Sequence, residues 1–190
     1  DYLTQLENAE GTSAEQKAVI TALRNYGLEA KAYLGLIENS GTTMGDVDKP
    51  TTDKVVPEYN STTDVSFVGI QVVYDNTIGF RIAFSAKENV TVNNLKISVD
   101  DGVYTIYANE FTDVEIDGQT FKAVSFKGIK VSQFSKVFSF TFYDNDGTAL
   151  SGVAKYSVNS YFAEKDAQAK DYALSKALYL YGAAVKALAQ

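Results

Sequence analysis

Residues 137–143 read Val-Phe-Ser-Phe-Thr-Phe-Tyr, and this alternation of apolar and polar side chains decides the fold class. A period of two is the pattern of a β-strand with one buried face. Residues 78–85 repeat the pattern with Arg81 on the polar side, and shorter alternating runs follow at 95–99 and 104–108. We therefore predict several short strands in the middle of the chain, with the phenylalanines of 137–143 in the core.

Turn signals separate these strands, at Asn93-Asn94, Asp101-Gly102, Asp117-Gly118 and Asp146-Gly147. Asp-Gly pairs are typical of two-residue hairpin turns. Closely spaced strands with hairpin turns and no intervening helix are typical of an antiparallel sandwich. We predict an α+β fold with an Ig-like antiparallel β-sandwich of about seven to nine strands over residues 53–158.

The two ends of the chain share a helical phrase. Residues 22–32 read Ala-Leu-Arg-Asn-Tyr-Gly-Leu-Glu-Ala-Lys-Ala, and residues 177–187 read Ala-Leu-Tyr-Leu-Tyr-Gly-Ala-Ala-Val-Lys-Ala. Six of these eleven positions are identical at an offset of 155. Apolar residues recur at steps of three or four in both segments, which predicts an apolar face on each helix. We expect the terminal helices to pack together beside the sandwich, with Gly27 and Gly182 allowing their close approach.

Capping signals indicate where the helices begin and end. Ser13 and Gln16 match a capping box at the start of the N-terminal helix, Gly41 is its expected end, and Asp166 is the expected N-cap of the C-terminal helix. Residues 39–63 contain both prolines and are rich in Thr, Ser and Asp, which indicates a linker. The expected organisation is one composite module with N-terminal helices at 1–40, a linker at 41–52, the β-sandwich at 53–158 and a C-terminal helix at 159–190.

Composition excludes several classes of function. The 190 residues include no cysteine and no histidine, which removes thiolate chemistry, disulfides and the usual imidazole base. The net charge of −7 and the scarcity of arginine argue against nucleic acid and anionic membrane surfaces as partners. No apolar run reaches the about 20 residues of a membrane span. We expect no cofactor, and we expect a fragment of a longer protein, because Asp1 is not a natural start.

Two acidic segments invite comparison with metal sites. Residues 144–147 read Asp-Asn-Asp-Gly, but position 142 is Phe and no acid occurs at 150–154, so the EF-hand pattern fails and a tight hairpin is predicted. A second acidic set could hold Ca²⁺ through carboxylates and comprises Glu110, Asp113, Glu115 and Asp117. We interpret this set as solvated surface charge and predict no metal site.

Exposed aromatic side chains are the remaining candidates for function. The chain has thirteen tyrosines and no tryptophan. Alternation places Tyr107, Tyr143 and Arg81 on the face opposite the core. Tyrosine rings there could stack on sugar rings with Arg81 as polar partner, or they could cover the sheet beneath the helices.

Residues 155–161, Lys-Tyr-Ser-Val-Asn-Ser-Tyr, and residues 177–184, Ala-Leu-Tyr-Leu-Tyr-Gly-Ala-Ala, resemble a phrase of large surface proteins. In those proteins a strand ending Tyr-Ser-Val-Lys-x-Tyr leads into a helix with Leu-x-x-Tyr-Gly-Ala-Ala-Ala. They are multi-modular, are exported by anaerobic gut bacteria, and often carry glycan-active or Ig-like modules. Segment 22–32 fits the same phrase with Leu28-Glu29 as a departure. The resemblance implies export and a cell-surface or secreted setting, and it transfers no site residues.

Two hypotheses about function follow. In the first, the chain is a monomeric, non-catalytic module of a surface or glycan-degrading protein and binds or attaches to polysaccharide. In the second, it is a structural spacer or docks another surface-protein module. A carboxylate-based glycoside hydrolase is a third and weaker alternative, because it needs two acids facing each other across a cleft. We favour the first hypothesis.

Overall fold

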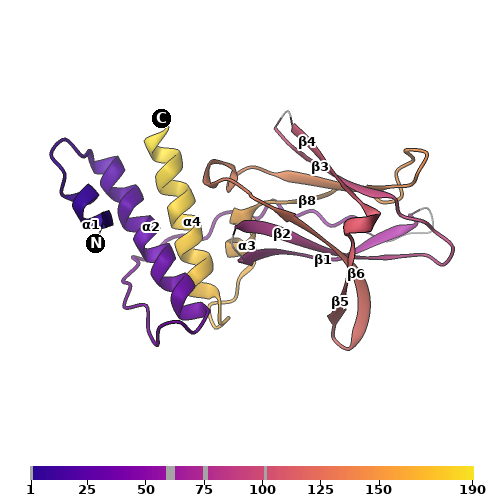
Figure 1. The fold of residues 1–190 in the computed structure, drawn as a ribbon, viewed down its shortest axis with the longest axis horizontal. Helices are drawn as coiled ribbons and strands as arrows, with labels where there is room; N and C mark the ends of the chain where they lie inside the picture. Colours follow the sequence, from indigo (N-terminus) through magenta and orange to yellow (C-terminus); the bar gives the residue numbers. More distant parts are fainter. Residues whose placement is uncertain (1, 59–62, 75–76, 101) are drawn as a thin grey trace. The chain divides into compact units, whose positions relative to one another are not determined.

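The computed structural model describes residues 2–58, 63–74, 77–100 and 102–190 (Figure 1). Asp101 of the predicted Asp101-Gly102 turn lies outside the described residues. This part of the chain has an α+β fold, as predicted, with four α-helices and eight strands. In chain order the elements are α1 (Tyr2–Glu7), α2 (Ala14–Tyr33), β1 (Val65–Tyr74), β2 (Ile78–Ala86), β3 (Asn94–Val99), β4 (Gly102–Tyr107), η1 (Ala108–Glu110), β5 (Thr112–Ile116), β6 (Gln119–Lys127), η2 (Val131–Gln133), β7 (Phe138–Tyr143), β8 (Ala154–Tyr156), α3 (Val158–Glu164) and α4 (Tyr172–Leu188).

The chain divides into two compact units. A helical unit comprises 1–52, 131–135 and 161–190, and a β unit comprises 53–130 and 136–160. Residues 131–135 lie inside the range predicted for the sandwich but belong to the helical unit, because Phe134 packs against Gly182 of α4. The segment predicted as a linker also belongs to the helical unit, where Met44 lines a cavity together with residues of α2 and α4.

The β unit contains two antiparallel sheets of four strands each. The first sheet has the order β1-β2-β6-β5 and the second has the order β4-β3-β7-β8. The rings of Phe80 and Phe84 in the first sheet contact those of Phe138 and Phe142 in the second, with ring centroids 5.2 and 4.3 Å apart. The two sheets therefore enclose a core between them, as in a β-sandwich.

The alternation in the sequence correctly identifies this core. Phe138, Phe140 and Phe142 of β7 are fully buried, and Ile82 of β2 is buried equally well. Burying a side chain of this size stabilises the fold by about 1.5–3 kcal/mol. Because the period of a strand is two, burial of these residues turns their neighbours to the outer face of each sheet.

The predicted turns are confirmed in part. Asp117 and Gly118 join β5 to β6 with positive φ angles of 50° and 77°, which a two-residue hairpin of the Asp-Gly type requires. The carboxylate of Asp144 accepts hydrogen bonds from the backbone amides of Asp146 and Thr148 at 3.0 and 2.7 Å. These bonds stabilise the predicted tight turn after β7. Asn93-Asn94 is not a turn, because Asn94 begins β3 and pairs with strands on both sides.

Helix α2 begins as predicted and ends earlier than predicted. Ser13 and Gln16 form the complete capping box. The expected end at Gly41 is wrong, because the amides of Leu36 and Gly35 turn back to the carbonyls of Lys31 and Ala32 at 2.9 and 3.0 Å. Gly35 has a φ of 71°, and this pair of bonds is the Schellman motif that terminates a helix.

Helices α2 and α4 lie side by side in the helical unit (Figure 1). The rings of Tyr26 and Tyr181, equivalent positions of the repeated phrase, stack with centroids 6.2 Å apart. The two glycines of the phrase do not mediate this approach, which corrects our expectation. A side chain at Gly27 would meet nothing within 4 Å, whereas one at Gly182 would meet Phe134 at 3.0 Å.

Helix α4 begins at Tyr172 with Asp171 as its N-cap, not at Asp166 as expected. Asp166 instead accepts the amide of Gln168 in a preceding turn, at 2.7 Å. The Asp171 carboxylate lies 3.0 Å from the Lys165 ammonium and accepts a hydrogen bond from the Tyr161 hydroxyl. Burial alone would raise the pKa of Asp171, but these hydrogen bonds and the Lys165 charge outweigh burial and lower the pKa below its usual value.

Candidate functional site

The two predicted tyrosines lie in one row of the second sheet. Asn94 of β3 pairs with Tyr107 of β4 on one side and with Tyr143 of β7 on the other. Residues directly opposite in an antiparallel pair point to the same face. The neighbours Leu95, Ile106 and Phe142 are buried in the core, so the row points outward. We call Tyr107, Asn94 and Tyr143 the tyrosine row.

Asn94 is the polar centre of the tyrosine row. Asn94 is only 7% exposed, although it lies on the outer face of the sheet. Its side-chain oxygen is buried and has no hydrogen-bond partner in the described part of the chain. A buried acceptor without a partner costs about 1–3 kcal/mol, and such a group in a folded protein calls for an explanation. A ligand hydroxyl or amide would satisfy it once the protein atoms that cover the oxygen move aside.

The two tyrosines of the row present different surfaces. Tyr107 is 54% exposed at the end of β4, the edge strand of its sheet, so its ring is open to solvent. Tyr143 is half-buried, and the ammonium of Lys96 lies over its ring, 4.4 Å from the centroid. This is a cation–π contact, which places a positive charge over the ring in the same row of side chains as Asn94.

Arg81 does not belong to the tyrosine row. It lies in β2 of the first sheet and pairs with Gln71 of β1 and Ser125 of β6. Because Phe80 and Ile82 on either side of it are buried, Arg81 points to the outer face of the first sheet, away from the second. Arg81 therefore cannot be the polar partner of Tyr107 and Tyr143, a role for which Asn94 and Lys96 are placed instead.

The acidic residues do not gather into a metal site. Asp113 pairs with Lys122 at 2.7 Å, and Glu110 accepts the amide of Tyr107 at 3.4 Å. Among residues 2–58, 63–74, 77–100 and 102–190, no three Asp, Glu, His or Cys side chains lie together as metal ligands would. Glu115 and Asp117 belong to one strand end and its turn, so they do not face each other as glycosidase acids must.

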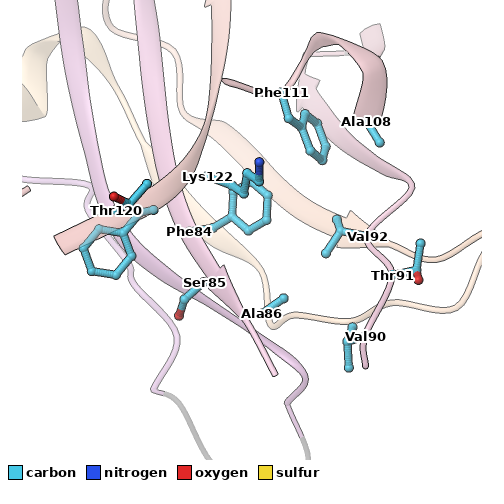
Figure 2. A pocket seen from close by; sticks show the side chains of 11 residues that line it. Phe84, Ser85, Ala86, Val90, Thr91, Val92, Ala108, Phe111, Thr120 and Lys122 are labelled. Carbon is cyan, nitrogen blue, oxygen red and sulfur yellow. The ribbon is translucent and has the colours of Figure 1, made fainter. Parts of the chain in front are cut away.

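A cavity of about 550 Å³ lies between residues of β2, the segment 90–92, η1 and β6 (Figure 2). Its walls are mostly apolar and include Phe84 and Phe111, whose rings meet edge to face at 5.4 Å. Among the described residues that line it, the one cationic group is Lys122, whose ammonium is already paired with Asp113. The volume of this cavity falls within the range of about 300–1,000 Å³ that is usual for ligand pockets. The charge of Lys122 in its lining, however, is already neutralised by Asp113.

Asn94 and Lys96 were absent from the site expected from sequence. The sequence does contain a signal for both residues. In β3 the apolar residues Leu95, Ile97 and Val99 alternate with polar ones. This alternation places Asn94 and Lys96 on the outer face of the strand. The turn predicted at Asn93-Asn94 competes with this alternation and excludes Asn94 from the predicted strand.

The tyrosine row and Lys96 beside it bring four groups together on the outer face of the second sheet. These are two aromatic rings, the unsatisfied oxygen of Asn94 and one ammonium. Among the helices of the described chain, none is both long and apolar enough to cross a membrane. Comparison of the chain with protein-family models, with curated proteins and with solved structures returned no match.

Proposed function

We propose that the chain is a non-catalytic carbohydrate-binding or attachment module of an exported, multi-modular bacterial surface or glycan-degrading protein, and that it acts as a monomer outside the cell. The observation that carries this proposal is the unsatisfied oxygen of Asn94 between two outward tyrosines. Sugars are rich in hydroxyl donors for such an acceptor, and their C–H faces suit the apolar faces of tyrosine rings.

The spacing of the tyrosine row supports this ligand class. Tyr107 and Tyr143 lie on two strands separated by β3, which places them about 10 Å apart at the usual strand spacing. Two rings of an extended polysaccharide chain that are separated by a third ring can span such a distance. Asn94 then lies beneath the middle ring, whose hydroxyl groups are available to donate.

The topology supports an Ig-like type of sandwich. The orders β1-β2-β6-β5 and β4-β3-β7-β8 correspond to the A-B-E-D and C′-C-F-G orders of Ig-like folds. Modules of this type commonly serve recognition, which agrees with the resemblance to surface proteins noted above. The fold alone does not select a ligand, so the proposal rests on the tyrosine row.

Native affinity electrophoresis tests the proposal, in gels containing cellulose-derived β-glucan, xylan, mannan, starch or mucin. We expect retardation in at least one gel. Tyr107→Ala should weaken binding about 3–10-fold, the value of one aromatic contact, and Tyr107→Phe should keep it. Tyr2→Ala, which removes an exposed tyrosine of α1, is the matched control. Migration of the parent protein at the same rate in every gel would contradict the proposal.

The second candidate is a structural spacer or protein-docking module. It is favoured by one observation, the Lys96 ammonium over Tyr143, because it occupies a ring face on which a sugar would otherwise stack. If the chain is a spacer or docking module, no glycan retards the parent protein, and Lys96→Ala migrates at the same rate as the parent in every gel. Under the carbohydrate-binding proposal, Lys96→Ala changes the affinity, because it alters both the ring face and the charge beside Asn94.

A catalytic role is tested separately. We expect no release of reducing sugar from any of these polysaccharides, and no cleavage of casein. Hydrolysis that disappears in Glu115→Gln or Asp117→Asn would instead establish a carboxylate-based hydrolase.

A further inference from the structure

Strand β4 is an unprotected edge of the second sheet. It stands at one end of the order β4-β3-β7-β8, and β3 is its only pairing partner among the described strands (Figure 1). Its six residues read Gly-Val-Tyr-Thr-Ile-Tyr and include no charged residue and no proline. The register against β3 runs from Gly102 to Tyr107 without a bulge. An edge of this kind is a ready template for another strand.

The other three sheet edges carry protection that β4 lacks. At β8, the amide and the carbonyl of Lys155 are bonded to Val55, at 2.8 and 3.0 Å. Strand β5 reads Thr-Asp-Val-Glu-Ile and bears two acids among its five residues. The register of β1 against β2 shifts between Phe67 and Gly69. Covering segments, charges and bulges are the usual devices against edge pairing, and β4 has none of them in the described part of the chain.

The hydrogen bonds of β4 show which of its backbone groups face the open edge. The amide of Ala108 donates to the carbonyl of Asn93 at 2.8 Å, so these two residues form a hydrogen-bonded pair at the end of the β3–β4 ladder. Bonded and non-bonded pairs alternate along an antiparallel ladder, so every second residue of β4 turns its amide and carbonyl away from β3. These residues are Val103, Thr105 and Tyr107. The amide of Tyr107 accordingly donates to the Glu110 carboxylate, at 3.4 Å, and not to β3.

We propose that β4 is the surface through which two copies of this chain pair, antiparallel, about a two-fold axis at Thr105. This register places Thr105 opposite itself and Val103 opposite Tyr107 of the second copy, so it uses all three edge-facing residues. It forms about six backbone hydrogen bonds between the copies, and the bonds from Tyr107 form when its amide leaves Glu110. A two-fold axis makes the interface the same surface on both copies, which is the commonest arrangement in homodimers.

The side chains of β4 are complementary to one another in this register. On the outer face, Val103, which is 64% exposed, lies opposite Tyr107, which is 54% exposed. On the inner face, Tyr104, which is 45% exposed, lies opposite Ile106. Aromatic residues opposite β-branched ones, and threonine opposite threonine, are favourable cross-strand pairs. Pairing of two copies therefore covers the exposed apolar side chains of this edge on both faces of the sheet.

The lysine nearest to the paired strands does not oppose their pairing. Lys96 of β3 lies opposite Thr105, but its ammonium lies over the ring of Tyr143 in β7, on the side of β3 away from β4. The β3 strands of the two copies are three strand spacings apart, about 14 Å, which exceeds the Debye length of about 8 Å at physiological salt. The net charge of −7 weakens association of two copies, but none of that charge lies in β4.

The small size of this contact determines where it forms. Two paired six-residue strands meet along a strip about 20 Å long and about 10 Å deep, far below the about 800 Å² per partner of a standard interface. The free chain therefore stays monomeric at low concentration, as proposed above, and copies pair where a surface concentrates them. For this step the inference rests on the proposed function, because the surface is then a polysaccharide. Copies bound to one polymer reach an effective concentration of about 1 mM, and a pair presents two tyrosine rows on one continuous sheet face.

Site-specific cross-linking tests both the edge and its register, because the chain has no cysteine of its own. Thr105→Cys places one thiol at the proposed axis, and Thr112→Cys places one on β5, another edge strand, as the matched control. Each variant is treated with a short bismaleimide over a range of concentrations, with and without a polysaccharide that retards the parent. We expect Thr105→Cys to form a covalent dimer at about 1 mM alone, and at concentrations about tenfold lower or less with the polysaccharide. Thr112→Cys should form little dimer under either condition.

Two blocking variants separate pairing from folding. Thr105→Pro removes an amide that faces the open edge and leaves the ladder to β3 in place, and Val103→Lys adds a charge to the edge. Val153→Lys, at a residue that is 49% exposed, is the matched control, and circular dichroism checks the fold of all three. In sedimentation velocity without polysaccharide, the sedimentation coefficients of the parent and of Val153→Lys should rise toward about 1 mM. Those of the blocking variants should stay at the monomer value.

The outcomes distinguish the edge from the proposed function. Equal cross-linking of Thr105→Cys and Thr112→Cys would overturn the proposal, as would a folded blocking variant that associates like the parent. A parent that stays monomeric at every concentration, with or without polysaccharide, would also overturn the pairing of two copies and would leave the edge to a strand of another protein. If no polysaccharide retards the parent but Thr105→Cys alone cross-links at high concentration, the β4 pairing is established and the glycan function is refuted.

Discussion

Replacing each glycine of the repeated phrase with alanine should have opposite effects on stability. The two positions are equivalent in sequence, so helix propensity favours alanine at both by about 1 kcal/mol. At Gly27 the added methyl group meets nothing within 4 Å, and the whole gain should appear. At Gly182 the methyl group would lie 3.0 Å from Cδ2 and 3.2 Å from Cβ of Phe134.

Phe134 has little room to move, because it is only 2% exposed. Inserting a methylene-sized group into a packed site costs about 1–3 kcal/mol, which offsets or exceeds the gain in propensity. We therefore expect Gly27→Ala to raise the free energy of unfolding by about 1 kcal/mol and Gly182→Ala to change it by about 0 to −2 kcal/mol. For a chain of this length, 1 kcal/mol corresponds to about 2–4 °C in Tm.

Urea unfolding followed by far-ultraviolet circular dichroism measures both changes. The double variant Gly182→Ala with Phe134→Leu should recover part of the loss, because the smaller side chain makes room for the methyl group, and a double-mutant cycle isolates that coupling. Equal stabilisation by Gly27→Ala and Gly182→Ala would refute the packing of Phe134 against Gly182.

Two further changes test other contacts. Gly79→Ala should destabilise the β unit by about 2–4 kcal/mol, because its methyl group would lie 2.3 Å from the backbone oxygen of Phe126. Gly69→Ala in the same sheet is the control, because the space at Gly69 is open. It should be neutral or slightly stabilising in the same urea titration. Asp171→Asn should lower the Tm near neutral pH. Because the folded pKa of Asp171 is lowered, its stabilisation is complete above the ordinary pKa of about 3.9 and declines as pH falls from there through the folded pKa, so the Tm values of parent and variant should converge in acid. A constant difference from neutral pH to the acid limit would contradict this role.

Local features of the sequence predict the elements of this fold well. The alternation at 137–143 identifies β7 and its buried face, Asp117-Gly118 identifies a hairpin, and Ser13 with Gln16 identifies the start of α2. Each of these signals depends on neighbours within a few residues. The sequence predicts less reliably where two residues carry the same local signal. Gly35 and Gly41 are both possible ends of α2, and both have positive φ.

Long-range pairing is what the sequence could not provide for the candidate site. Tyr107, Tyr143 and Arg81 share the outward register, but β2 pairs with β6 whereas β3 pairs with β7. That partition places Arg81 on a different sheet from the two tyrosines. Asn94 lies between the two tyrosines because β3 pairs with β4 on one side and with β7 on the other. A pattern within β3 alone reveals neither this pairing nor the unsatisfied oxygen.

The interaction that distinguishes a sugar site from a bare sheet face is the hydrogen bond to Asn94. A ¹⁵N-labelled protein titrated with short oligosaccharides of cellulose, xylan, mannan and starch reports it through the side-chain amide signal of Asn94. We predict that a saturating oligosaccharide shifts this signal together with the backbone signals of Lys96, Tyr107 and Tyr143. Binding that leaves the Asn94 amide unmoved, or no shift with any oligosaccharide, would contradict the assignment of the tyrosine row as a carbohydrate site.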